Sequence, residues 1–354
     1  MFASAGAMRR IAAAVAAAAV LGCGAEKPAP RSGSPADALP PNITRLVDQG
    51  VRADWSADGT HLLYLNGLVG DVFELDLATH AARPLTSHFA HAGFTRARYL
   101  ANGDILLCGP RADAPGAERG RWASELWLLE RSLARPAQPL DEACFEGPAV
   151  SRKSLHIAWT VSDYPEHVLF GRSEIWTGEI SYEGGAPRIV NRRKVLGRSA
   201  FYYLAFLETQ DFRPPDEREL LFTAYAWRGG EAMGVDLETG ALHNYSQSWG
   251  YDEIEGVFPD GQSTAVEREP DNYWAVPGGA IDIWRTALDG SGASERLTHF
   301  SDFAGYGANN PAISPDGRWM AFGLREAGGA QGNGAGIFLF DLRYVGNDRK
   351  GGPR

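Results

Sequence analysis

Short apolar segments alternate with polar turn residues along most of the chain. In the clearest copies, at 54–64, 254–267 and 310–322, an apolar stretch runs into an Asp-Gly turn and a second apolar stretch follows. An Asp side chain bonds its own backbone and Gly tolerates positive φ, so each copy predicts a two-stranded hairpin. Weaker copies lie at 100–107, 149–159 and 204–222.

A third apolar strand follows each hairpin, and most copies then turn into a fourth strand. The fourth strand is visible as Arg-Pro-Leu-Thr from Arg83 and as Arg-Leu-Thr-His from Arg296. Four antiparallel strands repeated six times are typical of a six-bladed β-propeller, and residues 43–345 allow about 50 residues per blade. The expected fold class is therefore all-β, with six four-stranded antiparallel blades.

The last copy ends after its third strand, at Leu342. The segment Ile43–Val47 resembles the fourth strands of the other copies. An outer strand at the start of the chain and a missing one at its end predict a ring closed by an N-terminal outer strand. Such closure removes exposed sheet edges.

The N-terminal segment has the pattern of an export signal. Arg9 and Arg10 precede an apolar run at 11–21, which is too short to span a bilayer. The run ends in Val-Leu-Gly-Cys at 20–23, which resembles the lipobox of bacterial lipoproteins. That resemblance implies cleavage after Gly22 and a lipid on Cys23; an ordinary secreted protein is the alternative.

The remaining boundaries follow from composition. We expect a signal peptide at 1–22, a lipidated cysteine with a flexible Pro- and Ser-rich tether at 23–42, the propeller at 43–345 and a disordered tail at 346–354. By resemblance to sorted lipoproteins, Gly24 favours the outer membrane, with the protein facing the periplasm.

The repeat itself resembles a known family. Ser314-Pro-Asp-Gly, followed by Met320-Ala-Phe, is similar to the WD40-like repeat of the TolB propeller and of the dipeptidyl peptidase IV N-terminal domain. The resemblance covers about residues 43–345 and implies the fold, but it says little about activity. The α/β domain of TolB and the hydrolase domain of the peptidases have no counterpart in this sequence, so their partners and activity are not expected here.

Composition narrows the function classes. The 354 residues include 44 acidic and 34 basic side chains, for a net charge of −10, which disfavours a general nucleic-acid binder. Three cysteines exclude a disulfide-dense scaffold. Cys108 and Cys144 lie in or beside neighbouring predicted blades, and they form either one disulfide or two buried thiols.

The predicted loops are unequal on the two faces of the ring. Long loops at 109–123, 162–173, 268–280 and 325–336 fall on one face, which is the predicted working face. Its carboxylates suit a cation or a basic partner segment, and its aromatics suit a sugar or a protein partner. Capping of the blades and simple solvation are the alternatives. The candidate ligand- or partner-binding residues are Glu166, His167, Tyr251, Asp252, Glu255, Asn272, Tyr273, Trp274, Asn309 and Asn310.

Linear catalytic motifs are missing from the sequence. It contains no His-Glu-x-x-His, no Gly-x-Ser-x-Gly and no P-loop. We therefore expect no cofactor, no metal and no catalytic residue, and a lipid-anchored envelope module that binds a protein or glycan partner. The alternative is a propeller enzyme that acts on polysaccharide, with residues from several blades meeting in the channel mouth.

The anchor is directly testable. Replacing Cys23 by Ser removes the sulfur that would carry the lipid, so the variant should leave the membrane fraction while the parent protein stays in it. Cell fractionation followed by immunoblotting measures this. Unchanged membrane association of the Cys23→Ser variant would rule out the lipid anchor.

Overall fold

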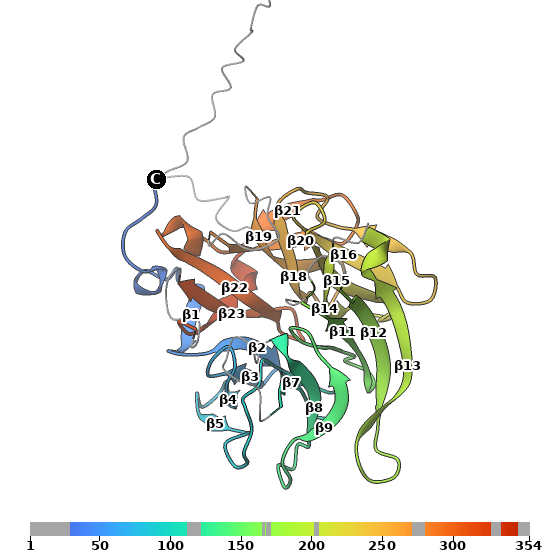
Figure 1. The fold of residues 1–354 in the computed structure, drawn as a ribbon. Helices are drawn as coiled ribbons and strands as arrows, with labels where there is room; N and C mark the ends of the chain where they lie inside the picture. Colours follow the sequence, from blue (N-terminus) through green and yellow to red (C-terminus); the bar gives the residue numbers. More distant parts are fainter. Residues whose placement is uncertain are drawn as a thin grey trace, which may run out of the picture.

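The computed structural model describes residues 29–111, 122–164, 167, 171–201, 205–270, 280–326 and 334–345. These residues form β-strands and a few short 3-10 turns, arranged as antiparallel units of four strands around a common centre (Figure 1). The first sheet consists of β2 (Val51–Trp55), β3 (His61–Leu65), β4 (Val72–Asp76) and β5 (Ala82–Pro84). The second consists of β6 (Arg96–Tyr99), β7 (Ile105–Pro110), β8 (Ser124–Leu129) and β9 (Gln138–Ala143).

The later sheets repeat this order. The third consists of β10 (Ala149–Val150), β11 (His156–Ser162), β12 (Ser173–Ser181) and β13 (Arg188–Gly197). An eight-stranded sheet contains β14 (Phe206–Phe212), β15 (Glu219–Tyr225), β16 (Gly230–Asp236), β17 (Leu242–Asn244), β18 (Tyr251–Val257), β19 (Ser263–Glu269), β20 (Asp282–Ala287) and β21 (Ser294–Arg296). The last contains β22 (Tyr306–Ile313), β23 (Trp319–Glu326), β24 (Ile337–Asp341) and β1 (Ile43–Val47). The 3-10 turns are η1 (Pro35–Asp37), η2 (Arg198–Phe201), η3 (Phe300–Asp302) and η4 (Leu342–Tyr344).

The Asp-Gly turns have the predicted chemistry. The side chains of Asp58, Asp260 and Asp316 each accept a hydrogen bond from the backbone N–H two residues further on, at 2.9 to 3.0 Å. The glycine after each aspartate adopts φ between +65° and +71°. These two features close the hairpin between the first and second strands of a unit, so the sequence repeat is a repeat of turn geometry.

The expectation of six separate sheets is wrong in one respect. Four sheets are separate and four-stranded, but β14–β17 and β18–β21 belong to one eight-stranded sheet. A single parallel pair, Gly230 with Tyr251, joins β16 to β18. The physical reason is the absence of side chains at this junction: the Gly230 N–H donates to the Gly250 carbonyl at 3.0 Å, and a Cβ on Gly229 would lie 2.3 Å from that same oxygen.

The two ends of the chain contribute to the same sheet. Strand β1 pairs antiparallel with β24, with Ile43 opposite Phe340. The first and last sheets also pack together, because the Trp55 indole donates to the Ala312 carbonyl at 2.9 Å. The N-terminal strand therefore supplies the outer strand that the last repeat lacks.

The apolar core lies between successive units. Trp159 in β11 is fully buried and packs in one cluster with Leu126 and Leu128 from β8. Comparable clusters lie between the other neighbouring units, so each sheet buries both of its faces. This arrangement leaves only the innermost strands facing the centre.

The segment before β1 differs from the predicted tether. Arg31 pairs with Phe303, the Arg31 N–H donates to the Asp302 carbonyl at 2.7 Å, and η1 follows with Pro35 buried. Ala36 and Leu39 pack against the cluster between β18–β21 and the last sheet. Residues 31–42 therefore pack on the propeller through apolar residues within the Pro-rich segment. Residues 23–28 and 346–354 lie outside the described residues. Within the described residues, no helix is long and apolar enough to cross a membrane.

Cys108 and Cys144 are joined by a disulfide, with their Cα atoms 6.1 Å apart. Cys108 lies in β7, and Cys144 immediately follows β9 in the link to the third unit. Both are buried in the cluster shared with β11.

The disulfide yields a stability prediction. The cysteines are 36 residues apart, so loss of the bond should lower the free energy of unfolding by about 4 kcal/mol. Cys108→Ser, Cys144→Ser and the double variant should lose the same amount, because the bond is lost only once. Urea unfolding of the oxidised and reduced protein measures this, and mass spectrometry of alkylated, non-reduced protein that found two free thiols would contradict it.

Candidate functional site

Polar side chains from five of the repeating units, all but one of them charged, meet at the centre of the molecule. They come from the innermost strands β2, β6, β14, β18 and β22, from β19, and from the link that precedes β10. We call this set the central polar cluster; its members are Arg52, Arg96, Glu146, Glu208, Glu253, Glu255, Glu267 and Asn310. All but Glu253 and Asn310, which are half-buried, are at most 5% exposed.

Backbone irregularities place several of these side chains. The ladders of β2, β18 and β22 each shift register, and Arg52, Glu255 and Asn310 are among the unpaired residues at the shifts. Arg52 and Asn310 have φ of 58° and 47°, and Glu146 has φ of 62°. Bulges re-aim side chains and positive φ is uncommon outside glycine, so the strands depart from regular geometry where they reach the cluster.

The two arginines have different partners. Arg52 donates to Glu146 Oε2 at 2.6 Å and to the Thr95 carbonyl at 2.6 Å. Arg96 lies between two carboxylates instead, 3.5 Å from Glu255 and 3.7 Å from Glu208. Gly147 gives the Arg96 side chain its path, because a Cβ there would lie 2.7 Å from the Arg96 Cγ.

The opposite side of the cluster is acidic. The Asn310 backbone N–H donates to Glu267 Oε1 at 2.6 Å, and its side-chain amide donates to Glu255 Oε1 at 2.9 Å. Glu253, Glu255 and Glu267 each place a carboxylate oxygen within 4.8 Å of the other two. The cluster thus holds five carboxyl groups against two guanidinium groups.

Burial and mutual repulsion raise the pKa values of Glu208, Glu253 and Glu267. Burial, followed by the Glu255 carboxylate, raises the pKa of Glu267 to about 8. Burial also raises the pKa values of Glu253 and Glu208 well above their usual range, with Glu267 the largest electrostatic cause for Glu253 and Glu253 for Glu208. Burial alone would lower the pKa of Arg96, but Glu255 and Glu208 raise it. Arg96 therefore stays charged while part of the acid group keeps its protons.

This arrangement has two chemical uses. A protonated Glu267 is a neutral acid that can donate a hydrogen bond or a proton at neutral pH. A cation can instead replace the protons, because three converging carboxylates supply part of the oxygen shell that hard cations prefer. No metal site was expected from the sequence, whereas the Glu253–Glu255–Glu267 group has ligand types and spacing that fit one.

Aromatic rings adjoin the cluster and continue around the centre. Neighbouring rings lie 4.8 to 6.1 Å apart, and the series crosses from the second unit to β18. We call it the aromatic arc; its members are Trp122, Phe145, Tyr164, Phe206, Tyr225 and Tyr251. Two members contact the acids directly: Tyr225 donates to Glu208 Oε2 at 2.8 Å, and the Tyr251 hydroxyl donates to Glu253.

The structure separates the residues proposed from sequence. Glu255 and Asn310 meet in the central polar cluster, and Tyr251 belongs to the aromatic arc. Asp252 does not join them, because it pairs with Arg268 at 3.1 Å. Asn309 faces Gly323, where a Cβ would lie 2.5 Å from its Oδ1.

One further candidate is described by the structure and lies outside the cluster. His167 is exposed; its backbone N–H donates to the Asp163 carbonyl, and its carbonyl accepts the Gly171 N–H. Glu166, Asn272, Tyr273, Trp274 and Cys23 lie outside the described residues.

Several members of the site were not anticipated from sequence. Arg52 and Arg96 occupy first strands of their repeats, and Glu208 occupies the equivalent strand β14. Charged residues inside apolar strands were the available signal, since buried charges are rare unless paired. Their convergence depends on ring geometry and bulges, which a single sequence does not reveal.

The raised pKa values predict a pH effect on stability. Glu267 binds a proton more tightly in the folded than in the unfolded state, so its stabilising contribution is complete below pH 4.5 and is lost as the pH rises through about 8. In urea unfolding, the free energy of unfolding should fall less between pH 5 and pH 8 for Glu267→Gln than for the parent protein. The exposed Glu183→Gln control should keep the parent slope, and an identical slope for Glu267→Gln would contradict the raised pKa.

Comparison with known proteins identifies the fold. No protein-family model matches the chain, and a search of curated proteins finds no match. Among solved structures, a putative TolB of Agrobacterium tumefaciens aligns at 18% identity and a TM-score of 0.50 over 72% of this chain and 77% of its own. A gluconolactonase of Xanthomonas campestris aligns at 13% identity and a TM-score of 0.53 over 84% of this chain and 88% of its own. With the sheet arrangement above, these similarities establish an all-β propeller of antiparallel four-stranded units.

Proposed function

We propose that this protein is a lipid-anchored β-propeller of the bacterial cell envelope that binds a basic segment of a protein partner. Its ring has six blades when the eight-stranded sheet is counted as two, since one residue pair alone joins β16 to β18. The pairing of β1 with β24 supports a ring closed by the N-terminal strand. The excess of acid in the central polar cluster, bordered by the aromatic arc, carries the functional proposal.

The charge of the cluster favours a cationic ligand. Five carboxyl groups face two guanidinium groups, and burial together with the neighbouring carboxylates raises the pKa values of Glu208, Glu253 and Glu267. A lysine or arginine side chain placed among them would replace protons by a permanent positive charge. This exchange of protons for a bound cation lets the acids ionise at neutral pH and stabilises the complex.

The outer part of the site suits such a side chain. Glu253 in the cluster is half-buried, as are Trp122, Tyr164 and Phe206 in the arc, so both the cluster and the arc have members that reach the surface. Aromatic faces attract cations, and the stem of a lysine or arginine is apolar enough to pack on rings. The geometry fits a basic side chain that enters past the rings towards Glu253.

The proposed anchor would hold the propeller near a membrane. Seven residues lie between Cys23 and Arg31, which already pairs with Phe303 on the body. Even fully extended, the eight residue steps from Cys23 to Arg31 span about 28 Å. A lipid on Cys23 would therefore keep the propeller close to the bilayer in the outer membrane, facing the periplasm, with little freedom to move away.

Crosslinking in the native envelope tests the proposal. The parent protein should capture a defined protein partner, and Glu253→Gln should reduce capture at least tenfold because it removes the accessible carboxylate of the cluster. The exposed Glu183→Gln control should capture as much as the parent. Binding that survives Glu253→Gln undiminished, or a glycan array that binds at this site instead, would contradict the proposal.

A second candidate function rests on Glu267. Its pKa of about 8 keeps a proton available at neutral pH next to the carboxyl group of Glu255, an arrangement suited to general acid–base catalysis on a polysaccharide. Turnover of polysaccharide by the parent protein, lost in Glu267→Gln with the fold intact, would favour the enzyme over the binding module.

A further inference from the structure

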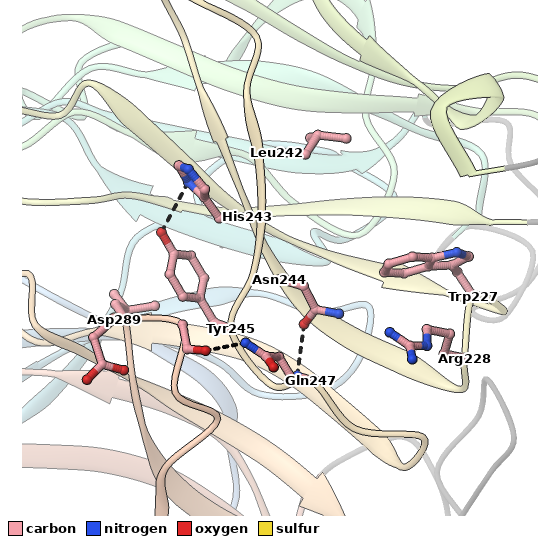
Figure 2. Close-up of a pocket in the computed structure, with 10 residues that line it drawn as sticks. Trp227, Arg228, Leu242, His243, Asn244, Tyr245, Gln247 and Asp289 are labelled. Carbon is pink, nitrogen blue, oxygen red and sulfur yellow. Dashed lines mark hydrogen bonds between the residues drawn. The ribbon is translucent and has the colours of Figure 1, made fainter.

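A second site lies along β17, which pairs with β16 and shares no residue with the central polar cluster. Figure 2 shows the residues that line it. It is a pocket of about 660 Å³ between the β15–β16 hairpin tip and the β20–β21 turn. Its volume is that of a small-molecule site rather than of a flat protein interface. The lining residues are Trp227, Arg228, Leu242, His243, Asn244, Tyr245, Gln247, Leu288, Asp289 and Gly290.

The floor of this pocket is fixed by its own network. The Tyr245 hydroxyl donates to Glu219 at 2.6 Å, and His243 Nδ1 lies 2.7 Å from the same carboxylate oxygen. Arg213 donates to Glu219 at 2.8 Å, and its guanidinium lies 5.6 Å from the Tyr245 ring centroid. Tyr245 and His243 are therefore held in place before any ligand arrives.

Arg228 lines the pocket and carries an exposed guanidinium. Among the described residues, nothing forms a salt bridge or hydrogen bond with it. Asn244 is already engaged, because its side-chain oxygen accepts the Gln247 backbone N–H at 2.9 Å and its side chain also hydrogen-bonds the Glu231 carboxyl group. Figure 2 shows Asn244 and Arg228 on the same side of the pocket. The guanidinium without a partner calls for a negatively charged acceptor.

Tryptophans border the same end of the pocket. The Arg228 guanidinium lies 4.7 Å from the ring centroid of Trp249 and 5.7 Å from that of Trp227. Trp249 is 61% exposed, which is unusual for so large an apolar side chain. An exposed indole beside the Arg228 guanidinium offers a stacking surface for a ring that also carries polar groups.

The other end of the pocket has a different character. Asp289 is exposed there and Gln247 reaches the Gly290 carbonyl, so the β20–β21 turn is tied to the link before β18. A carboxylate and carbonyl oxygens accept from hydroxyl groups. The pocket thus runs from donors and rings at one end to acceptors at the other.

We infer that this pocket binds an acidic saccharide. Its carboxylate would lie on Arg228, a sugar ring would stack on Trp249, and hydroxyl groups of the next unit would donate to Asp289. A nucleoside polyphosphate fits less well, because Arg228 is the single cation without a carboxylate partner in the described lining. A purely apolar ligand would leave the Arg228 guanidinium desolvated and unpaired.

Binding of two matched sugars tests the inference on the full-length chain in detergent. The probes are a tetrasaccharide of alternating glucuronate and N-acetylglucosamine and the neutral tetrasaccharide of N-acetylglucosamine, and calorimetry measures the affinities. The acidic probe should bind at least tenfold more tightly. Arg228→Ala and Trp249→Ala should each weaken it at least tenfold, while Arg188→Ala, an exposed arginine on another hairpin, should leave it unchanged.

Each alternative outcome has a definite meaning. Equal affinity for the two sugars, or unchanged affinity of Arg228→Ala with an unchanged melting temperature, overturns the carboxylate assignment. Competition by adenosine triphosphate at lower concentration than the acidic tetrasaccharide overturns the saccharide class. Glu253→Gln should not alter sugar affinity, so the proposal for the pocket along β17 and the proposal for the central polar cluster are tested independently.

Discussion

The convergence of the innermost strands is the constraint on which the rest of the structure depends. Their side chains share one small central space, because both faces of each sheet are already covered by neighbouring sheets. This protein fills that space with charge instead of apolar groups: Arg96 lies between Glu208 and Glu255, and Arg52 pairs with Glu146. A buried charge that loses its partner is strongly destabilising, so the partners constrain one another.

The surplus of acid gives the centre its chemical character. Two arginines do not balance five carboxyl groups, and the remaining repulsion is relieved by protons, as the raised pKa of Glu267 indicates. A site that retains protons because its carboxyl groups are buried beside one another can exchange those protons for a cation. The proposed basic partner segment makes use of this property. The pocket along β17 instead presents a positive charge, the Arg228 guanidinium.

The sequence alone predicted the repeat of strands, but it did not predict most of the residues that meet in the central polar cluster. Asp58, Asp260 and Asp316 predicted the hairpins because turn chemistry is local. Glu255 and Asn310 were proposed from their place at the entry to their repeats, and the structure brings them to 2.9 Å. Arg96 and Glu208 escaped notice because their meeting depends on strands more than 100 positions apart, and the join of β16 to β18 depends on a backbone approach at glycine. The packing of residues 31–42 was obscured by a composition typical of linkers.

The account depends most directly on the protonation of the central polar cluster. Carbon-13 NMR of glutamate side-chain carboxyl groups, recorded across a pH titration, observes each group separately. The structure predicts a glutamate resonance with a midpoint near 8 that disappears in Glu267→Gln. If every glutamate titrates within about one unit of 4.3, as exposed carboxyl groups do, the central cluster is not a buried, acid-rich site and the account is wrong.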